Sequence, residues 1–166
     1  MGALDRAAQQ AGLTVLSGVS SVPALSSAAV AALREGLTDI HLIEAAIMPG
    51  NRAPRGLSVM RAILSQAGRP VALWRGSQWT MERGWGGRKT ISLDLDGVKP
   101  LRRRSASLIG APDLQLFPTH FGARSVVFRA GLELSIMHRG LGALAWLVRL
   151  RLLRSLAPRA PMLKGV

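Results

Sequence analysis

Two strand-loop-helix passages near the N-terminus constrain the fold of this chain most strongly. In the second passage, an apolar run at 40–47 leads through the loop 48–56 into a helical pattern at 57–67. The loop combines two Pro, two Gly and one Asn with two Arg. The earlier loop, at 17–23, has the same context. Loops between rigid elements are a usual place for binding sites, so we expect the two loops to form one edge of a cleft.

The periodicity of the whole chain predicts an α+β fold: a mixed β-sheet with helices on one face and a C-terminal helical segment. Helices are expected at 3–11 and from Ser20 or Ser21, as the cap, to Arg34; each ends at a Gly. Strands are expected at 13–16, 71–74, 78–81, 89–93, 113–117 and 124–134, with a hairpin turn at 75–77 and a helix at 136–156. Residues 84–87 are expected to be a flexible connection, and 94–107 match no pattern.

The chain is strongly basic, with 22 Lys and Arg against 9 Asp and Glu and a net charge of +13. Almost all the cations are Arg, and the longest run is only 102–104. The four Trp and three Phe are not arranged as a stacking platform for bases. We therefore do not expect nucleic acid as a partner.

The chain has no Cys, which excludes disulfides, thiolate metal ligands and Cys nucleophiles. No apolar run is long enough to span a membrane, and polar residues interrupt the first twelve positions, so no signal peptide is expected. The expected location is the cytoplasm, with a peripheral contact to the inner membrane as the alternative.

The histidines offer no metal site. His41, His120 and His138 are far apart and lack a second ligand at helical or strand spacing. His41 is expected in the core or at a strand edge, and His138 on the surface. No residue is assigned as a catalytic acid, base or nucleophile, because the serines at 17–27 lack the Gly-x-Ser-x-Gly pattern of a nucleophile elbow.

Arg52 and Arg55 are the preferred anion-binding residues, with Asn51 beside them. Arg presents a planar fork that suits carboxylate or phosphate, and Pro54 restrains the backbone between the two side chains. The alternative is that both are solvated surface residues.

The C-terminal helix is apolar beyond one face. At helical spacing, Leu141, Leu144, Ala145, Val148 and Leu152 share a core face, whereas Trp146, Leu150 and Leu153 fall among Arg149, Arg151 and Arg154. The second face is expected to be buried against a missing domain or a second copy in a homo-oligomer. Contact of the 140–156 helix with a membrane surface is the alternative.

Three stretches resemble the bacterial saccharopine dehydrogenase-like oxidoreductases. They are Gly12–Ser26, where a Gly-containing loop leads through Pro into a helix; Pro49–Ile63, with Ala53-Pro54-Arg55-Gly56-Leu57; and Phe128–Leu134 followed by His138-Arg139-Gly140-Leu141.

The resemblance implies that 1–17 is the end of a nucleotide-binding domain and 18–166 a substrate and oligomerisation domain. The family binds NAD(P) on an N-terminal Rossmann domain with a Gly-x-Gly-x-x-Gly loop, which this chain lacks. It implies that Ser20, Ser21 and Pro23 contact the cofactor in the intact enzyme, and that Asn51, Arg52 and Arg55 bind an acidic substrate. Where the saccharopine enzymes proper carry an acidic residue, this chain has Ser21-Val22.

No cofactor is expected to bind this chain alone, and the nucleotide-binding domain or subunit is the expected partner. The chain is expected to be a fragment or one half of a split enzyme, inactive by itself.

Overall fold

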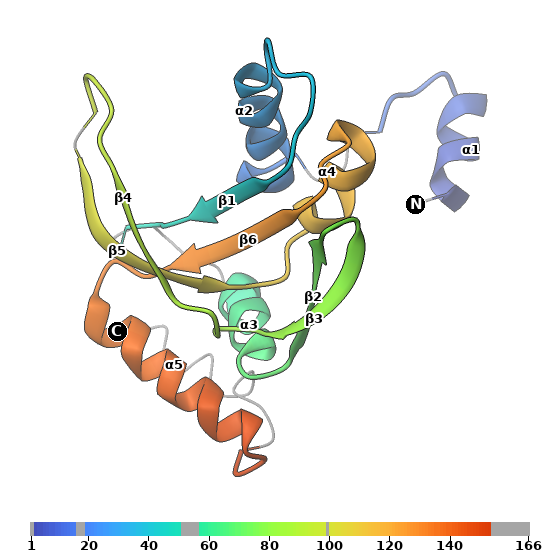
Figure 1. Ribbon diagram of the computed structural model, residues 1–166. Helices are drawn as coiled ribbons and strands as arrows, with labels where there is room; N and C mark the ends of the chain where they lie inside the picture. Colours follow the sequence, from blue (N-terminus) through green and yellow to red (C-terminus); the bar gives the residue numbers. More distant parts are fainter. Residues whose placement is uncertain (1, 16–18, 51–56, 99, 154–166) are drawn as a thin grey trace.

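A computed structural model of the chain describes residues 2–15, 19–50, 57–98 and 100–153. Helices and strands are both present, and the fold is α+β, as the periodicity predicted (Figure 1). The elements are α1 (Gly2–Gln10), the wide helical turn η1 (Ser21–Leu25), α2 (Ser26–Leu33), β1 (Ile43–Ile47), α3 (Leu57–Gln66), β2 (Pro70–Arg75), β3 (Gln78–Arg83), β4 (Lys89–Leu93), β5 (Leu101–Leu108), α4 (Asp113–Phe121), β6 (Val126–Gly131) and α5 (Ser135–Arg149).

The strands form one six-stranded sheet organised around β6. β1 runs parallel to β6 along its whole length, from the pair Ile43–Val126 to the pair Ile47–Ala130. The other edge of β6 is shared by two antiparallel hairpins: β2–β3 meets it at Val126, and β5–β4 meets it at 129–131. The sheet is therefore mixed, with a single parallel pair among the described strands.

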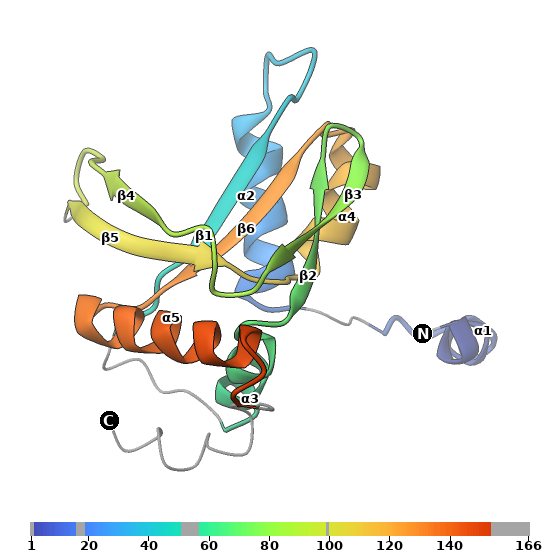
Figure 2. The same ribbon diagram turned by 60° about the horizontal axis from the view of Figure 1, so that its bottom comes forward.

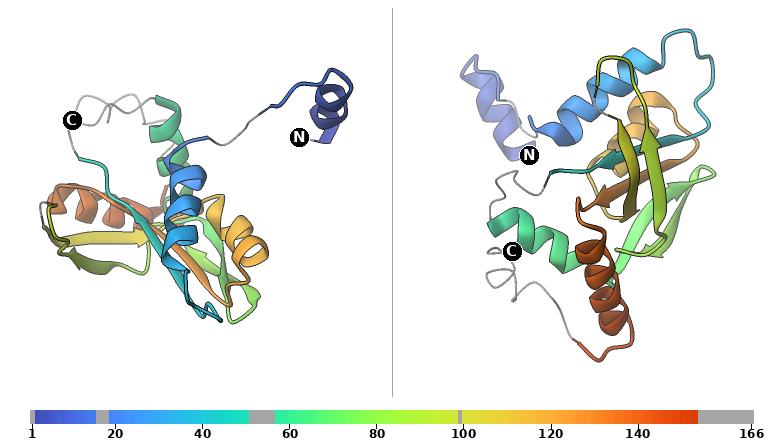
Figure 3. Two further views of the ribbon diagram at one scale, coloured as in Figure 1. Left: turned by 90° about the horizontal axis from the view of Figure 1, so that it is seen from above. Right: turned by 90° about the vertical axis from the view of Figure 1, so that its left-hand side faces the viewer.

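Strand register divides the sheet into two faces, because directly paired residues point the same way and successive residues alternate. Ile47, Ala130 and Ser107 form one row. α5 packs on this face, since its His138 contacts Ser107. α3 and α5 lie next to one another in the side view (Figure 3, right). Glu44 and Arg129 point to the opposite face, which is called the open face below.

The core lies between the sheet and the helices. Its most completely buried large residues are Phe117 of α4, Phe128 of β6 and Leu73 of β2. On α5, Leu141 and Ala145 are buried. Leu144 and Val148 pack against the same cluster, so four of the five residues predicted for the core face of this helix are confirmed there. Leu152 is exposed, and Leu153 instead packs against the core, so both of those assignments were wrong.

Close backbone approaches explain two glycines. Gly68, which follows α3, has φ 71°, and a Cβ there would lie 2.2 Å from the carbonyl oxygen of Ala145. Gly131, at the end of β6, could not carry a Cβ without placing it 2.7 Å from the carbonyl oxygen of Ser105. Both contacts are with backbone, which cannot move aside as a flexible side chain can. These glycines let α5 pack against the α3–β2 turn and let β5 pair closely with β6.

The segment 84–87 is a packed turn and not the flexible connection that its glycines indicated. The Trp85 N–H donates to the carbonyl of Leu108, and the Leu108 N–H donates to that of Gly86. The Trp85 side chain is buried, and its indole nitrogen donates to the carbonyl of Ile63. Two backbone bonds and a buried indole hold this turn onto β5.

Two further expectations were wrong, and one unassigned stretch proved to be a strand. Residues 113–117 belong to helix α4, because Leu114, Phe117 and Phe121 recur at helical spacing and are all buried. Residues 13–15 are extended but pair with no strand among the described residues. The unassigned stretch 94–107 contains most of β5, whose polar sequence is held by backbone pairing with β4 and β6. The hairpin turn after Arg75 and the strands at 71–74, 78–81 and 89–93 are confirmed. Of the strand expected at 124–134, only 126–131 is a strand.

Candidate functional site

The predicted substrate residues Asn51, Arg52 and Arg55 lie outside the described residues, so their positions stay a prediction. The predicted cofactor residues lie at the start of η1. Ser20 and Ser21 are exposed and Pro23 is partly buried, and the Val22–Pro23 peptide bond is cis. The Ser20 side chain makes no cap hydrogen bond; its backbone carbonyl instead accepts from Ala24 and Leu25.

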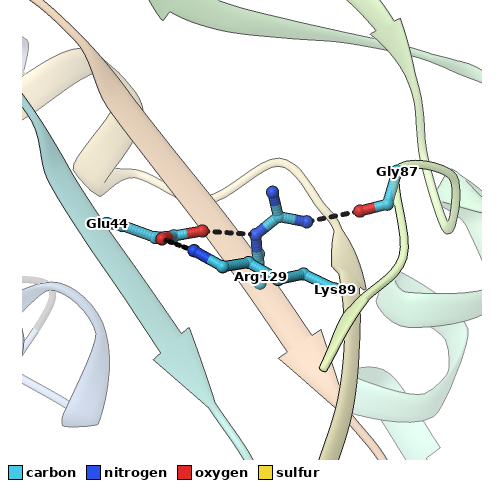
Figure 4. Close-up of polar contacts among 4 residues, drawn as sticks. All are labelled: Glu44, Gly87, Lys89 and Arg129. Atoms are coloured by element: carbon cyan, nitrogen blue, oxygen red, sulfur yellow. Dashed lines mark hydrogen bonds and ion pairs between the residues drawn. The ribbon is translucent and has the colours of Figure 1, made fainter. Parts of the chain in front are cut away.

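A charged cluster on the open face joins segments that are far apart in the sequence (Figure 4). The Glu44 carboxylate of β1 accepts from two cations. Arg129 Nε of β6 lies 2.7 Å from Glu44 Oε1, and Lys89 Nζ of β4 bonds the other oxygen, Oε2. Arg129 Nη1 donates to the carbonyl of Gly87. The cluster therefore ties β1, β4 and β6 to the packed turn at 84–87.

Lys89 reaches Glu44 from a strand that does not pair with β1. Lys89 pairs with Ala106 of β5, and Ala106 pairs with Gly131 of β6. In the order of the sheet, β5 and β6 therefore separate β4 from β1, and the contact between Lys89 and Glu44 links strands that are not neighbours.

The electrostatics of the cluster favour the ionised Glu44. Burial by itself would raise the pKa of the Glu44 carboxyl, but the hydrogen bonds and positive charges of Lys89 and Arg129 outweigh it, and the pKa lies below its ordinary value. Two cations against one carboxylate leave a net charge of one positive unit. Arg129 contributes Nε and Nη1 to the contacts drawn in Figure 4.

A shallow hollow of about 300 Å³ adjoins the cluster. It is lined by Glu44, Ala46, Lys89, Thr90, Ile91 and Ser92. Its lining therefore carries a cation, a carboxylate and two hydroxyls together with the apolar side chains of Ala46 and Ile91. This arrangement can bind a small carboxylate or phosphate group through charge-assisted hydrogen bonds. It contains no group placed as a nucleophile.

A second polar arrangement is buried between α5 and β5. His138 Nε2 lies 2.9 Å from Ser107 Oγ, and both residues are 2% exposed. The Trp85 ring meets the His138 ring edge-on, with centroids 5.4 Å apart. Burial lowers the pKa of His138 below its ordinary value, and the charge of Arg88 lowers it further. His138 Nδ1 has no hydrogen-bond partner among the described residues. The pair lacks a third orienting group and does not form a catalytic triad.

The histidine expectations were reversed. His138, predicted on the surface, is buried, because residues 135–149 form one unbroken helix whose core face includes position 138. His41, predicted in the core or at a strand edge, is exposed and precedes β1. In the part of the chain that the structure describes, no three His, Asp or Glu side chains gather in a way that could hold a metal ion.

Sequence reasoning missed the open-face cluster as a whole. Glu44 sits in an apolar strand, and Lys89 and Arg129 belong to strands read only for their hydrophobic pattern. The available signal was alternation: a charged residue within an apolar strand, flanked by residues that point inward, must face the other side of the sheet. Which cation it meets there depends on strand order.

Neither a scan against protein-family models nor a search of curated proteins returned a match to this chain. The geometry and the residue patterns therefore carry the functional argument.

Proposed function

We propose that this chain is the substrate-side domain of a saccharopine dehydrogenase-like NAD(P)-dependent oxidoreductase, and that it works together with a nucleotide-binding domain. The family assignment rests on the three stretches at 12–26, 49–63 and 128–141. Hydride transfer requires a cofactor held against the substrate, so this chain provides only the substrate side of the reaction.

One structural observation carries the two-domain part of the proposal. Leu13 and Val15, in the extended segment after α1, are 66% and 65% exposed. Figures 1 and 2 draw α1 apart from the sheet and the other helices. The strands of a parallel sheet, such as that of a Rossmann domain, are covered by helices on both faces. The last strand and helix of a Rossmann domain would be covered in this way by the rest of that domain.

Two groups of cations could bind an acidic substrate. The first is the pair that the sequence predicts, Arg52 and Arg55. Among the described residues, Arg129 and Lys89 beside the open-face hollow offer a second, in which Glu44 already occupies part of the donor capacity. The proposal assigns the substrate to Arg52 and Arg55, because their loop follows β1 directly and the resemblance covers it.

The test is a fusion. A nucleotide-binding domain from a bacterial member of the family, ending before its own last helix, is joined to residue 1 of the full chain. The fusion should bind NADPH, measured by fluorescence titration, because residues 2–15 complete the domain. Leu13→Asp with Val15→Asp should raise the Kd at least about tenfold, or about 1.4 kcal/mol.

The matched control is Leu93→Asp with Val98→Asp, which alters two exposed apolar residues of the β4–β5 region and should leave the Kd unchanged. If the fusion fails to bind NADPH while the donor domain with its own last helix and strand does bind, residues 1–17 are not that element and the proposal is wrong. In an NADP-active fusion, Arg55→Ala should raise KM for the acidic substrate; an unchanged KM removes Arg55 from the site.

A further inference from the structure

We propose that the outer face of α5 binds an anionic membrane surface. This goes beyond the proposed oxidoreductase role and concerns where the domain is held. α5 has two apolar faces, and only one of them is used in the core. The outer stripe consists of Ile136, Ala143 and Trp146 of α5 and of Leu150, the residue that caps the helix. Their spacing of seven, three and four residues places them along one side of the helix, and the same spacing places Arg139 among them.

The stripe is open to solvent. Ile136 is 77% exposed and Trp146 is 56% exposed, and Leu150 is exposed as well. The same helix buries Leu141 and Ala145 on its opposite side. Its outer apolar residues are therefore not a by-product of poor packing, since α5 is already anchored by its inner face. A Trp with Leu and Ile on one helix face is the composition of an interfacial membrane helix.

The positive charge around the stripe favours an anionic membrane over a second copy of the chain as the surface that binds it. Arg139 and Arg149 of α5 are exposed, and so is Arg151, two residues after the helix ends. No Asp or Glu follows Glu133 in the sequence, whereas Arg139, Arg149, Arg151, Arg154, Arg159 and Lys164 do. A second copy packed on this stripe would bring like charges together without an acidic residue from this part of the chain to pair with them. An anionic lipid surface attracts each of these cations.

The length and composition of α5 suit a helix that lies on a membrane surface and does not cross the membrane. Within the described ranges, every helix is too short or too polar to cross a lipid bilayer. Long Arg side chains can keep their charged ends among lipid headgroups while the apolar stripe enters the boundary with the acyl chains. α5 lies away from α1 in Figures 1, 2 and 3.

The experiment is co-sedimentation of the full chain with phosphatidylcholine vesicles that contain about 30% phosphatidylglycerol, at low and at high salt. We expect binding that weakens strongly at high salt, since exposed charges are screened. Pure phosphatidylcholine should bind far less protein. Trp emission should shift to the blue on vesicles, and Trp146→Phe should lose most of this shift while Trp74, Trp79 and Trp85 remain.

Two variant pairs separate this surface from general basicity. Ile136→Ser with Trp146→Ser, and Arg139→Glu with Arg149→Glu, should each reduce vesicle binding at least tenfold. The controls are Leu93→Ser with Leu95→Ser and Arg102→Glu with Arg103→Glu, which alter exposed residues of the β4–β5 hairpin and should bind as the parent chain does. Circular dichroism checks that each variant is folded.

Three outcomes would overturn the proposal. Equal loss of binding in the α5 variants and in the matched controls would mean that total charge alone attracts the chain. Absence of binding to anionic vesicles by the folded parent chain would reject the surface directly. Sedimentation velocity that shows a dimer lost only in Ile136→Ser with Trp146→Ser, without vesicle binding, would make the stripe an interface between copies.

Discussion

His138 on α5 and Ser107 on β5 share a hydrogen bond 2.9 Å long in a site closed to solvent, and this polar contact is where the C-terminal helix meets the sheet. Ser107 lies in the row of Ala130 and Ile47, on the helix-covered face. Ser107 Oγ and His138 Nε2 satisfy one another there, so removing either side chain leaves the other atom without this partner. The docking of α5 is consequently sensitive to both residues and to pH.

Ser107→Ala should lower the free energy of unfolding by about 1–3 kcal/mol, because it leaves His138 Nε2 buried without its partner. Urea unfolding followed by Trp fluorescence measures this. Ser77→Ala, at the exposed β2–β3 turn, is the control and should change stability far less. A Ser107→Ala chain as stable as its parent would show that the contact does not support α5.

The pKa of His138 is lowered in the folded chain, so the unfolded chain takes up a proton first as pH falls. The contribution of His138 to the free energy of unfolding is fully present above the ordinary pKa of about 6.5. It declines as the pH falls from there toward the lowered pKa of the folded chain. Urea titrations at intervals across this window should show the decline. His138→Met should flatten it, whereas His41→Gln, at an exposed position, should not. A decline of the same slope in His138→Met would assign it to another group.

Glu44→Gln should destabilise the sheet by about 1–3 kcal/mol at neutral pH, because Arg129, whose side chain is only 12% exposed, loses its charged partner. The pKa of Glu44 is lowered, so its contribution is present above the ordinary carboxyl pKa and is lost as pH falls through the lowered value. The difference between parent and variant should therefore shrink in acid. Glu82→Gln breaks the exposed pair with Arg75 and should change stability by less than about 1 kcal/mol. Equal effects of the two substitutions would contradict a special role for Glu44.

Gly68→Ala should be more destabilising than Gly36→Ala. Both glycines have positive φ, 71° and 80°, so both substitutions carry the same backbone strain. Only at Gly68 would the new Cβ meet backbone, 2.2 Å from the Ala145 carbonyl oxygen, while Gly36 has nothing within 4 Å. The clash should add about 1–3 kcal/mol, the usual range for overpacking. Thermal unfolding of the two variants measures the difference, and identical melting temperatures would mean that α5 does not pack against this turn.

Much of the local structure follows from sequence patterns. The hairpin after Arg75 was predictable, because Gly76-Ser77 lies between two strand patterns and suits a two-residue turn. In the structure both residues take the positive φ that such a turn requires. The α4 segment was not, because an apolar run as short as 113–117 fits a strand or a helix equally well. Continuing the count to Phe121 resolves it, since the helical spacing holds over a second turn.

The candidate sites show most clearly what local sequence patterns can predict and what only the tertiary structure decides. Apolar spacing, turn residues and charge are local properties of a chain, and they were enough to predict an α+β fold, most strands and an α5 with apolar residues on both sides. The partners of Glu44 were not predictable, since Lys89 and Arg129 lie 45 and 85 residues away and meet it only through the order of β1, β6, β5 and β4. The burial of His138 likewise depends on which face of α5 meets β5. Contacts between distant segments are selected by strand order and packing, which no local pattern encodes.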